Sequence, residues 1–302
     1  MPELPDIELY LHALRPRVIG EALESARLFS PSLLRTVAPP LTDAIGKRVI
    51  GLSRLGKRIV FQFDSDLFLV IHLMIAGRFL WDDAHALAKR EQPLRPGGKS
   101  TLAAFSFPTG RLLLTEQGTK RRAALSLFQG ERALMDEDPG GIDPLAATPT
   151  DIGSALGQDR RTVKRLLTDP HVFSGIGNAY SDEILFAARV APNRSAESLS
   201  EDERLRIGEG TLFVLREWTE RLQMEFGSSF PGRGKVTAFR PDFAVHGRFG
   251  LPCRVCSKPV QRVRYADNES NYCAICQNGG RLIPDRALSK LLKGDWPTSL
   301  VD

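Results

Sequence analysis

The chain has 302 residues, of which 42% are hydrophobic, so it is long enough for two or three domains with packed cores. Its net charge of +5, from 41 basic and 36 acidic side chains, fits a polyanionic partner, although many cytosolic proteins carry a similar excess. No stretch approaches the roughly 20 apolar residues of a transmembrane helix, and the N-terminus lacks the pattern of a secretory signal. We therefore expect a soluble, intracellular protein.

The first six residues combine a candidate nucleophile with two carboxylates. Removal of the initiator methionine would leave Pro2 as the amino terminus, a secondary amine. Because α-amino groups titrate near ~8, part of this amine is unprotonated and nucleophilic at neutral pH. Glu3 supplies an acid–base partner and Asp6 follows. Taken alone, the six residues favour a disordered start with a helix N-cap over a covalent catalyst.

Residues 5–19 show the periodicity of an amphipathic helix. Apolar side chains recur at three- and four-residue intervals, at Leu4, Ile7, Leu11, Leu14 and Val18. Acidic residues in the first turn suit the helix dipole, and a glycine ends the helix. The candidate nucleophile therefore lies at the rigid start of a helix.

From about residue 22 to 132 the pattern changes to short β-branched and aromatic runs separated by turn residues. The runs are Val49–Leu55, Arg58–Asp64, Leu67–His72, Gly77–Trp81, Leu102–Pro108 and Arg111–Thr115. This pattern predicts an antiparallel sandwich or barrel. Residues 82–100 are typical of a long exposed loop.

Residues 135–148 are rich in acids, proline and glycine, which is typical of a linker. The helical pattern returns after it, and a small all-α domain is expected. Its predicted helices cover residues 150–157, 161–168, 178–189 and 200–226. Beyond residue 228 the chain is rich in glycine, proline and arginine, with short strand signals.

All four cysteines lie near the C-terminal end, in two pairs separated by sixteen residues. The pairs are Cys253-x2-Cys256 and Cys273-x2-Cys276. Two such knuckles on a β-hairpin form a tetrahedral site with four thiolates, which favours one structural zinc ion over an iron site of rubredoxin type. The site either only stabilises a small domain that has little core of its own, or it also presents a hairpin to nucleic acid, since Arg262 and Arg264 lie on the hairpin.

A glycine-rich turn precedes the predicted helix at Asn178, in the sequence Gly175-Ile176-Gly177. Free N–H groups at a helix start suit a phosphate, although an ordinary helix connection has the same form. Other basic residues are uninformative taken singly: Lys57 at a hairpin tip, and further along the chain Arg121, Arg122 and Lys164. His72 ends an apolar strand, where a core histidine is more common than a catalyst.

Together these motifs resemble the formamidopyrimidine-DNA glycosylase/endonuclease VIII family, in a divergent subfamily. The resemblance runs through the whole chain in order, over Pro2-Glu3-Leu4-Pro5, Gly56-Lys57, the His72–Gly77 segment, Gly175-Ile176-Gly177-Asn178, Val245-His246-Gly247-Arg248 and the four cysteines.

The resemblance implies an α+β fold with DNA bound between two lobes. Residues 1–134 would form an N-terminal antiparallel β-sandwich with an N-terminal helix, followed by a linker over 135–148. A helix–two-turn–helix DNA-binding domain would cover 149–235. A four-cysteine zinc finger with a C-terminal tail would cover 236–302.

The resemblance also implies a base-excision DNA repair enzyme, a DNA glycosylase with abasic-site lyase activity. Pro2 would attack C1′ of an oxidatively damaged nucleotide in double-stranded DNA, with Glu3 as general acid/base at the sugar. The secondary amine can form only a cationic iminium, which drives strand-cleaving β-elimination. Lys57 would contact phosphate and donate a proton. The target nucleotide must leave the base stack.

DNA contacts are expected from residues in both lobes, mostly to phosphates and therefore salt-sensitive. The predicted contacts are Asp6, His72, Ile75, Arg121, Arg122, Lys164, Asn178, Arg262, Arg264 and Asn268. We expect a monomer, located in the cytoplasm or, in a bacterium, at the nucleoid.

Four positions depart from the family pattern. Asp6 replaces a glutamate, so a contact near Pro2 is one methylene shorter. Ile75 replaces a methionine that fills the space left by the flipped nucleotide. Ala123 replaces an intercalating aromatic residue. Asn268 stands where the finger hairpin carries an arginine linked to δ-elimination, so mainly β-elimination is expected.

Two alternative functions remain compatible with the sequence. One is a non-catalytic binder of damaged or abasic DNA, suggested by Asn268. The other is a zinc-ribbon protein that binds RNA or the ribosome, which leaves Pro2 and Glu3 unexplained. The lesion is not predicted, because base choice depends on a pocket and on a loop within 227–241 that matches neither main branch of the family.

Overall fold

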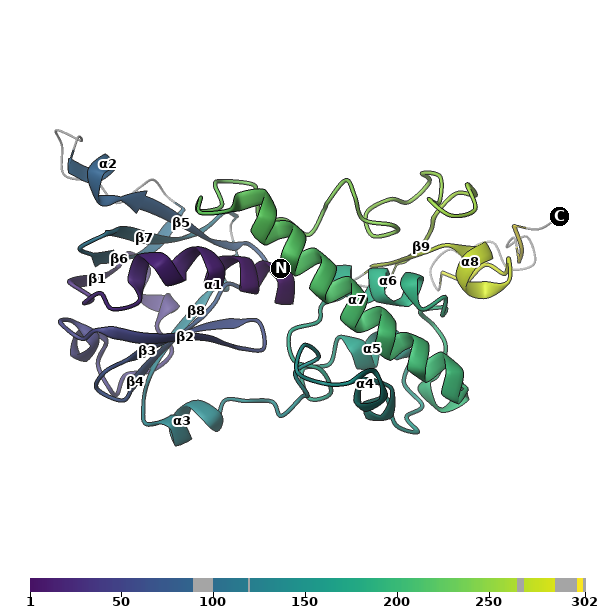
Figure 1. Ribbon diagram of the computed structural model, residues 1–302, viewed down its shortest axis with the longest axis horizontal. Helices are drawn as coiled ribbons and strands as arrows, with labels where there is room; N and C mark the ends of the chain where they lie inside the picture. Colours follow the sequence, from purple (N-terminus) through teal and green to yellow (C-terminus); the bar gives the residue numbers. More distant parts are fainter. Residues whose placement is uncertain (89–99, 119, 265–268, 286–297, 301–302) are drawn as a thin grey trace. The chain divides into compact units, whose positions relative to one another are not determined.

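The computed structural model describes residues 1–88, 100–118, 120–264, 269–285 and 298–300 (Figure 1). The chain divides into two compact units. Unit 1 comprises Met1–Asp138 and Thr219–Thr237, and unit 2 comprises Pro139–Trp218 and Ala238–Asp302. The domain boundaries expected at residues 134, 148 and 235 stay predictions. Within the described ranges, no helix has the length and apolar character needed to cross a membrane.

Unit 1 begins with helix α1, Leu4–Val18. Its first residues favour a helix start, because Glu3 is the N-cap, Pro5 lies in the first turn and Asp6 is acidic. The apolar side chains that predicted the helix are all buried. The prediction of a helix over residues 5–19 is correct to within one residue.

Two four-stranded antiparallel sheets follow, and their strands are those of a β-sandwich. One sheet has the order β1-β6-β7-β5 and the other β2-β3-β4-β8. The strands are β1 Ser25–Leu28, β2 Val49–Leu55, β3 Arg58–Phe63, β4 Leu67–His72, β5 Gly77–Asp83, β6 Thr101–Phe107, β7 Gly110–Glu116 and β8 Ala124–Gln129. Side chains from both sheets and from α1 share one hydrophobic core, which explains the alternating burial along the strands.

Short helices occupy several connections in unit 1. They are the 3-10 turns η1 Pro31–Leu33 and η2 Leu41–Ala44 and the helices α2 Ala84–Ala88 and α3 Glu131–Met135. Strand β5 runs on to Asp83 and α2 follows directly. The prediction that residues 82–88 belong to a loop is therefore wrong, and 89–99 lie outside the described residues. Strands β1 and β8 were not among the predicted strands.

Unit 2 contains the predicted helices, and each of their ends lies within two residues of the expected one. The elements are α4 Pro149–Ala155, α5 Val163–Leu167, α6 Asn178–Ala187, η3 Ala196–Ser198, α7 Glu201–Phe226, β9 Gln261–Arg264, β10 Glu269–Tyr272 and α8 Ala274–Asn278. Helix α7 crosses the division between the units at Trp218. Strands β9 and β10 form the predicted hairpin, and helix α6 packs against β10 and α8.

Candidate functional site

The amino-terminal end of α1 gathers buried polar groups. Pro2 is buried, and the side chains of Glu3 and Asp6 are 3% and 1% exposed. The Asp6 carboxylate accepts a hydrogen bond of 2.9 Å from the backbone N–H of Glu3, which fixes the backbone that follows Pro2. Asp6 is thus engaged inside the protein, and its predicted contact with DNA stays a prediction.

Lys57 lies next to this helix start, after the β2–β3 turn at Gly56, whose φ of +62° suits glycine. Burial lowers the pKa of Lys57, and the negative charge of Glu3 opposes this shift. The structure therefore brings the two predicted acid–base residues within electrostatic reach of each other. The Arg54 guanidinium at the end of β2 donates to the Glu8 carboxylate at 2.8 Å, which joins the hairpin to α1.

The α-amino group of the chain lies in the same environment. Burial lowers the pKa of the Met1 amine, Glu3 and Asp6 raise it, and Arg78 and Lys57 lower it further. An amine with a lowered pKa is a better nucleophile at neutral pH. Arg78, which follows Gly77 at the start of β5, was not predicted, since an arginine beginning a strand resembles any solvent-facing residue.

The segment between β4 and β5 is a tight turn. The Gly77 N–H donates to the Leu73 carbonyl at 2.9 Å, and a Cβ at Gly77 would lie 2.2 Å from that oxygen, so only glycine fits. Met74 has a φ of +53°, and Ile75 is 58% exposed at the tip. This exposure suits the predicted role of Ile75 as an apolar filler, which stays a prediction.

His72 ends β4 beside Lys57 and Arg58. Burial, followed by the charges of Arg58 and Lys57, lowers the pKa of His72 to about 4. The imidazole is therefore neutral at pH 7. Its Nε2 atom is buried and has no hydrogen-bond partner among the described residues. A contact of His72 with DNA would thus be a neutral hydrogen bond, and it stays a prediction.

The loop before β8 presents two exposed arginines, Arg121 and Arg122. The carboxylate of Glu116, only 2% exposed, accepts hydrogen bonds from the backbone N–H groups of Arg122 and Ala123, the shortest at 2.9 Å. Ala123 is 3% exposed and belongs to the core of unit 1. The position where the family carries an aromatic wedge is therefore a core position in this chain.

In unit 2, Lys164 connects three elements. Its ammonium group donates to the Asp182 carboxylate, and to the carbonyl oxygens of Asn178 and Glu269 at 3.3 Å each. These three acceptors match the three donors of a lysine. Lys164 is 9% exposed, so it joins α5, α6 and β10, and its predicted contact with the DNA backbone stays a prediction.

Asp182 is the centre of a buried polar network that the sequence did not reveal. Its carboxylate also accepts from His246 Nδ1 at 2.8 Å, the Asn271 N–H at 3.0 Å and the Ser270 hydroxyl at 3.3 Å. Burial opposes ionisation, but Lys164 and His246 hold the pKa of Asp182 below its usual value. The network fixes the finger hairpin against α6.

The neighbouring carboxylate of Glu183 accepts from the N–H groups of Ala244, Val245 and His246, at 2.6 to 2.9 Å. Here burial dominates and raises the pKa of Glu183. Asn178, predicted to grip phosphate, begins α6 directly after Gly177. Asn178 and Lys164 line a hollow of about 620 Å³ in unit 2.

The hairpin residues Arg262 and Arg264 have different surroundings. The Arg262 guanidinium lies 4.4 Å from the centre of the Phe249 ring and 3.7 Å from the Glu269 carboxylate. Arg264 is exposed, and its backbone N–H donates to Asp285 of the C-terminal tail at 2.9 Å. Asn268 lies outside the described residues.

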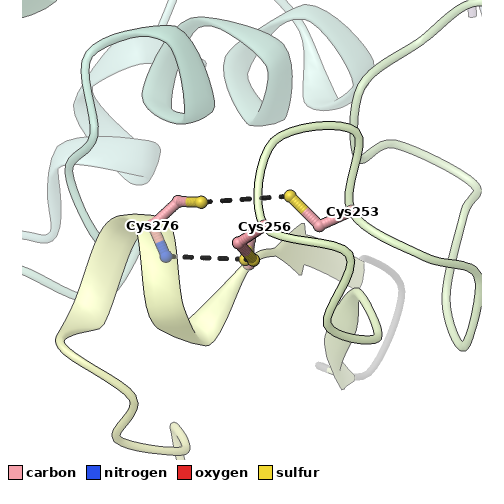
Figure 2. A group of neighbouring side chains, drawn as sticks. Cys253, Cys256 and Cys276 are labelled. Atoms are coloured by element: carbon pink, nitrogen blue, oxygen red, sulfur yellow. Dashed lines mark hydrogen bonds between the residues drawn. The ribbon is translucent and has the colours of Figure 1, made fainter.

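The four cysteines of unit 2 come together as the sequence predicted, and Figure 2 shows three of them, Cys253, Cys256 and Cys276. All four sulfur atoms lie within 4.8 Å of one another. The Sγ atoms of Cys253 and Cys276 are 3.9 Å apart, and those of Cys256 and Cys273 are 3.4 Å apart. A tetrahedral ion with Zn–S bonds of about 2.3 Å separates its ligands by about 3.8 Å, so the arrangement fits a tetrahedral metal ion.

Comparison with protein families covers most of the chain. Residues 1–122 match the formamidopyrimidine-DNA glycosylase N-terminal domain, and residues 141–225 match the formamidopyrimidine-DNA glycosylase H2TH domain. H2TH is the helix–two-turn–helix domain that the sequence predicted.

Curated relatives and solved structures agree with this match. The formamidopyrimidine-DNA glycosylases of Heliobacterium modesticaldum and Geobacillus kaustophilus are each 32% identical, over 92% of this chain and 100% of their own length. The fold matches a Lactococcus lactis Fpg in complex with abasic-site DNA, with a TM-score of 0.77 at 22% identity over 91% of this chain and 99% of that one. The predicted family and α+β fold are confirmed: this chain belongs to the formamidopyrimidine-DNA glycosylase family.

Proposed function

We propose that the protein is a bifunctional DNA glycosylase and abasic-site lyase that excises oxidatively damaged bases from double-stranded DNA. The observation that carries the proposal is the convergence of Glu3 and Lys57 at the amino-terminal end of α1, where Pro2 is buried. Solved structures of Lactococcus lactis Fpg are complexes with abasic-site DNA, with N7-benzyl-Fapy-dG DNA and with DNA containing an oxidised pyrimidine, which supports this substrate class.

The chemistry begins at Pro2 after removal of Met1. The amine lone pair attacks C1′ of the damaged nucleotide, the glycosidic bond breaks with its electron pair leaving on the base, and the proton given up by the new ammonium nitrogen neutralises that base. The nitrogen lone pair then opens the C1′–O4′ bond while Glu3 protonates the ring oxygen, giving a cationic iminium. This iminium has no N–H proton to lose, so the positive charge remains on the adduct.

Strand cleavage follows from that charge. The iminium acidifies the C2′ proton, and its removal expels the 3′ phosphate by β-elimination. Burial lowers the pKa of Lys57, so its ammonium group gives up a proton more readily than that of an exposed lysine. Water then hydrolyses the iminium and releases Pro2 together with the unsaturated sugar product.

DNA binding in this proposal relies on phosphate contacts. Arg121 and Arg122 are exposed on a loop that Glu116 holds, and Asn178 at the start of α6 offers a side-chain amide donor to a phosphate. The proposal includes one structural zinc ion on Cys253, Cys256, Cys273 and Cys276. A zinc ion with four thiolates has no open position, so its role is to hold the finger hairpin.

Borohydride trapping tests the proposal, because borohydride reduces an iminium to a stable covalent adduct. Wild-type protein and Pro2→Gly are incubated with an abasic-site duplex and with duplexes carrying an oxidised base. The wild type should give a protein–DNA adduct on a denaturing gel, and Pro2→Gly should give much less. A wild type that binds these duplexes without forming an adduct is a non-catalytic binder.

A further inference from the structure

Arg78 joins two segments of unit 1 that are far apart in the sequence. Its Nε donates to the Val236 carbonyl at 2.7 Å. Its Nη1 donates to the Ile75 carbonyl at 3.1 Å and to the Gly77 carbonyl at 2.7 Å. One guanidinium therefore holds both the tight turn that carries Ile75 and the segment that follows α7.

The three acceptors are backbone carbonyls in fixed directions, which suits an arginine. Its planar group presents five N–H donors in a rigid fork, whereas a lysine ammonium is a compact charge on a flexible chain. The turn itself needs the left-handed Met74 and the missing Cβ of Gly77. Arg78 therefore adds a fixed restraint to a turn with little conformational freedom of its own.

The segment around Val236, whose carbonyl accepts from Arg78, is partly anchored in unit 1. Val236 is 3% exposed and belongs to the core of unit 1. Residues 233–237 and the start of β5 enclose a hollow of about 390 Å³, with Ile75, Arg78 and Arg233 in its lining. Arg78 thus sets the spacing between two walls of this hollow.

We propose that Arg78 is a positioning residue for the reaction: its guanidinium holds the Ile75 turn and the Val236 segment in place within unit 1. This inference rests on the proposed function for its chemical part, while its structural part concerns the free protein.

Two variants separate geometry from charge. Arg78→Lys keeps the charge but loses the fork, and Arg78→Gln loses both. Arg27→Gln, which removes an exposed arginine from β1, is the matched control. Borohydride trapping of an abasic-site duplex is measured under single-turnover conditions from pH 5 to 9, at temperatures where thermal unfolding shows each variant to be folded.

We expect Arg78→Lys to trap about tenfold or more slowly, because misplaced reacting groups lose rate, with the midpoint of the acid limb close to that of the wild type. Arg78→Gln should be slow to a similar extent, with its acid limb unmoved as well, because both variants lose the same three hydrogen bonds. Wild-type rates in either variant, or an acid limb that moves in Arg78→Gln alone, would overturn the positioning role.

Hydrogen exchange in the free protein tests the restraint independently of catalysis. Amides of residues 233–237 should exchange faster in both Arg78 variants than in Arg27→Gln. Unchanged exchange would overturn the structural part even if the enzyme is active. A wild type that forms no adduct but shows the expected exchange difference would instead contradict the proposed function and leave the Arg78 restraint standing.

Discussion

The carboxylate of Asp6 lies 2.9 Å from the backbone nitrogen of Glu3 and accepts its hydrogen bond. This bond holds the residue that follows the proposed nucleophile, at a helix start where both side chains are buried. The bond is one half of a capping box, in which the side chain of the third helical residue reaches back to the N-cap backbone.

Asp6→Ala should therefore affect both stability and rate. Loss of an N-terminal capping bond costs about 0.5–2 kcal/mol, so the thermal unfolding temperature should fall by a few degrees. The borohydride-trapping rate should fall as well, because the backbone next to Pro2 is released. Asp43→Ala, at an exposed acid in η2, is the control. An Asp6→Ala protein with the stability and rate of the control would contradict this account.

The Asp182 network predicts a pH-dependent contribution to stability. The pKa of Asp182 is lowered in the folded state, so the carboxylate stabilises the fold above its unfolded pKa of about 3.9. That contribution is lost as pH falls through the folded pKa. The gap in unfolding temperature between wild type and Asp182→Asn should therefore be largest near pH 7 and shrink as the pH falls below about 4.

Glu183→Gln provides a matched comparison, because the pKa of Glu183 is shifted in the opposite direction to that of Asp182. The pKa of Glu183 is raised by burial, so the stabilisation from its protonated form is present below the unfolded pKa and lost as pH rises through the folded value. The gap between wild type and Glu183→Gln should shrink as pH rises. If the gap in unfolding temperature changed with pH in the same direction for both variants, the opposite pKa shifts of Asp182 and Glu183 would be refuted.

Metal removal should disable DNA binding. The four thiolates surround a site that fits one zinc ion, and a small finger of this kind folds with its metal. Metal analysis should find one zinc per chain, and Cys273→Ser or chelation should weaken binding to an abasic-site duplex. Unchanged affinity of protein verified as metal-free would show that the finger does not position the hairpin.

The elimination products test the substitution at residue 268. With asparagine there, we expect mainly β-elimination ends on a denaturing gel. Asn268→Arg should raise the share of β,δ-elimination ends. A predominant δ-product from the wild type would contradict the inference drawn from this position.

Local patterns in the sequence predicted much of the fold. Runs such as Leu67–His72 alternate or stay apolar over a strand's length, and β4 occupies those residues. The spacing of the four cysteines was enough to predict that their sulfur atoms lie together at one site. Strand β8, Ala124–Gln129, buries the alternate side chains Leu125 and Leu127, but Phe128 interrupts the alternation of apolar and polar residues, so the sequence signal for this strand was weak.

Contacts between distant residues could not be predicted in the same way. Arg78 and Val236 are 158 positions apart, and Asp182 and Asn271 are 89 apart. Nothing local distinguishes an arginine that holds two loops from one that faces solvent. The convergence of Glu3 and Lys57 was expected only through the family resemblance, since it depends on how the β2–β3 hairpin lies against α1.

The central claim is that Pro2 is the covalent nucleophile, and the most direct test is the mass of the trapped peptide. Wild-type protein is reduced with borohydride on an abasic-site duplex, digested with nuclease and protease, and sequenced by tandem mass spectrometry. The account predicts a sugar remnant on the nitrogen of Pro2, in an amino-terminal peptide that lacks Met1. A remnant on Lys57 or another lysine, with Pro2 unmodified, would contradict it.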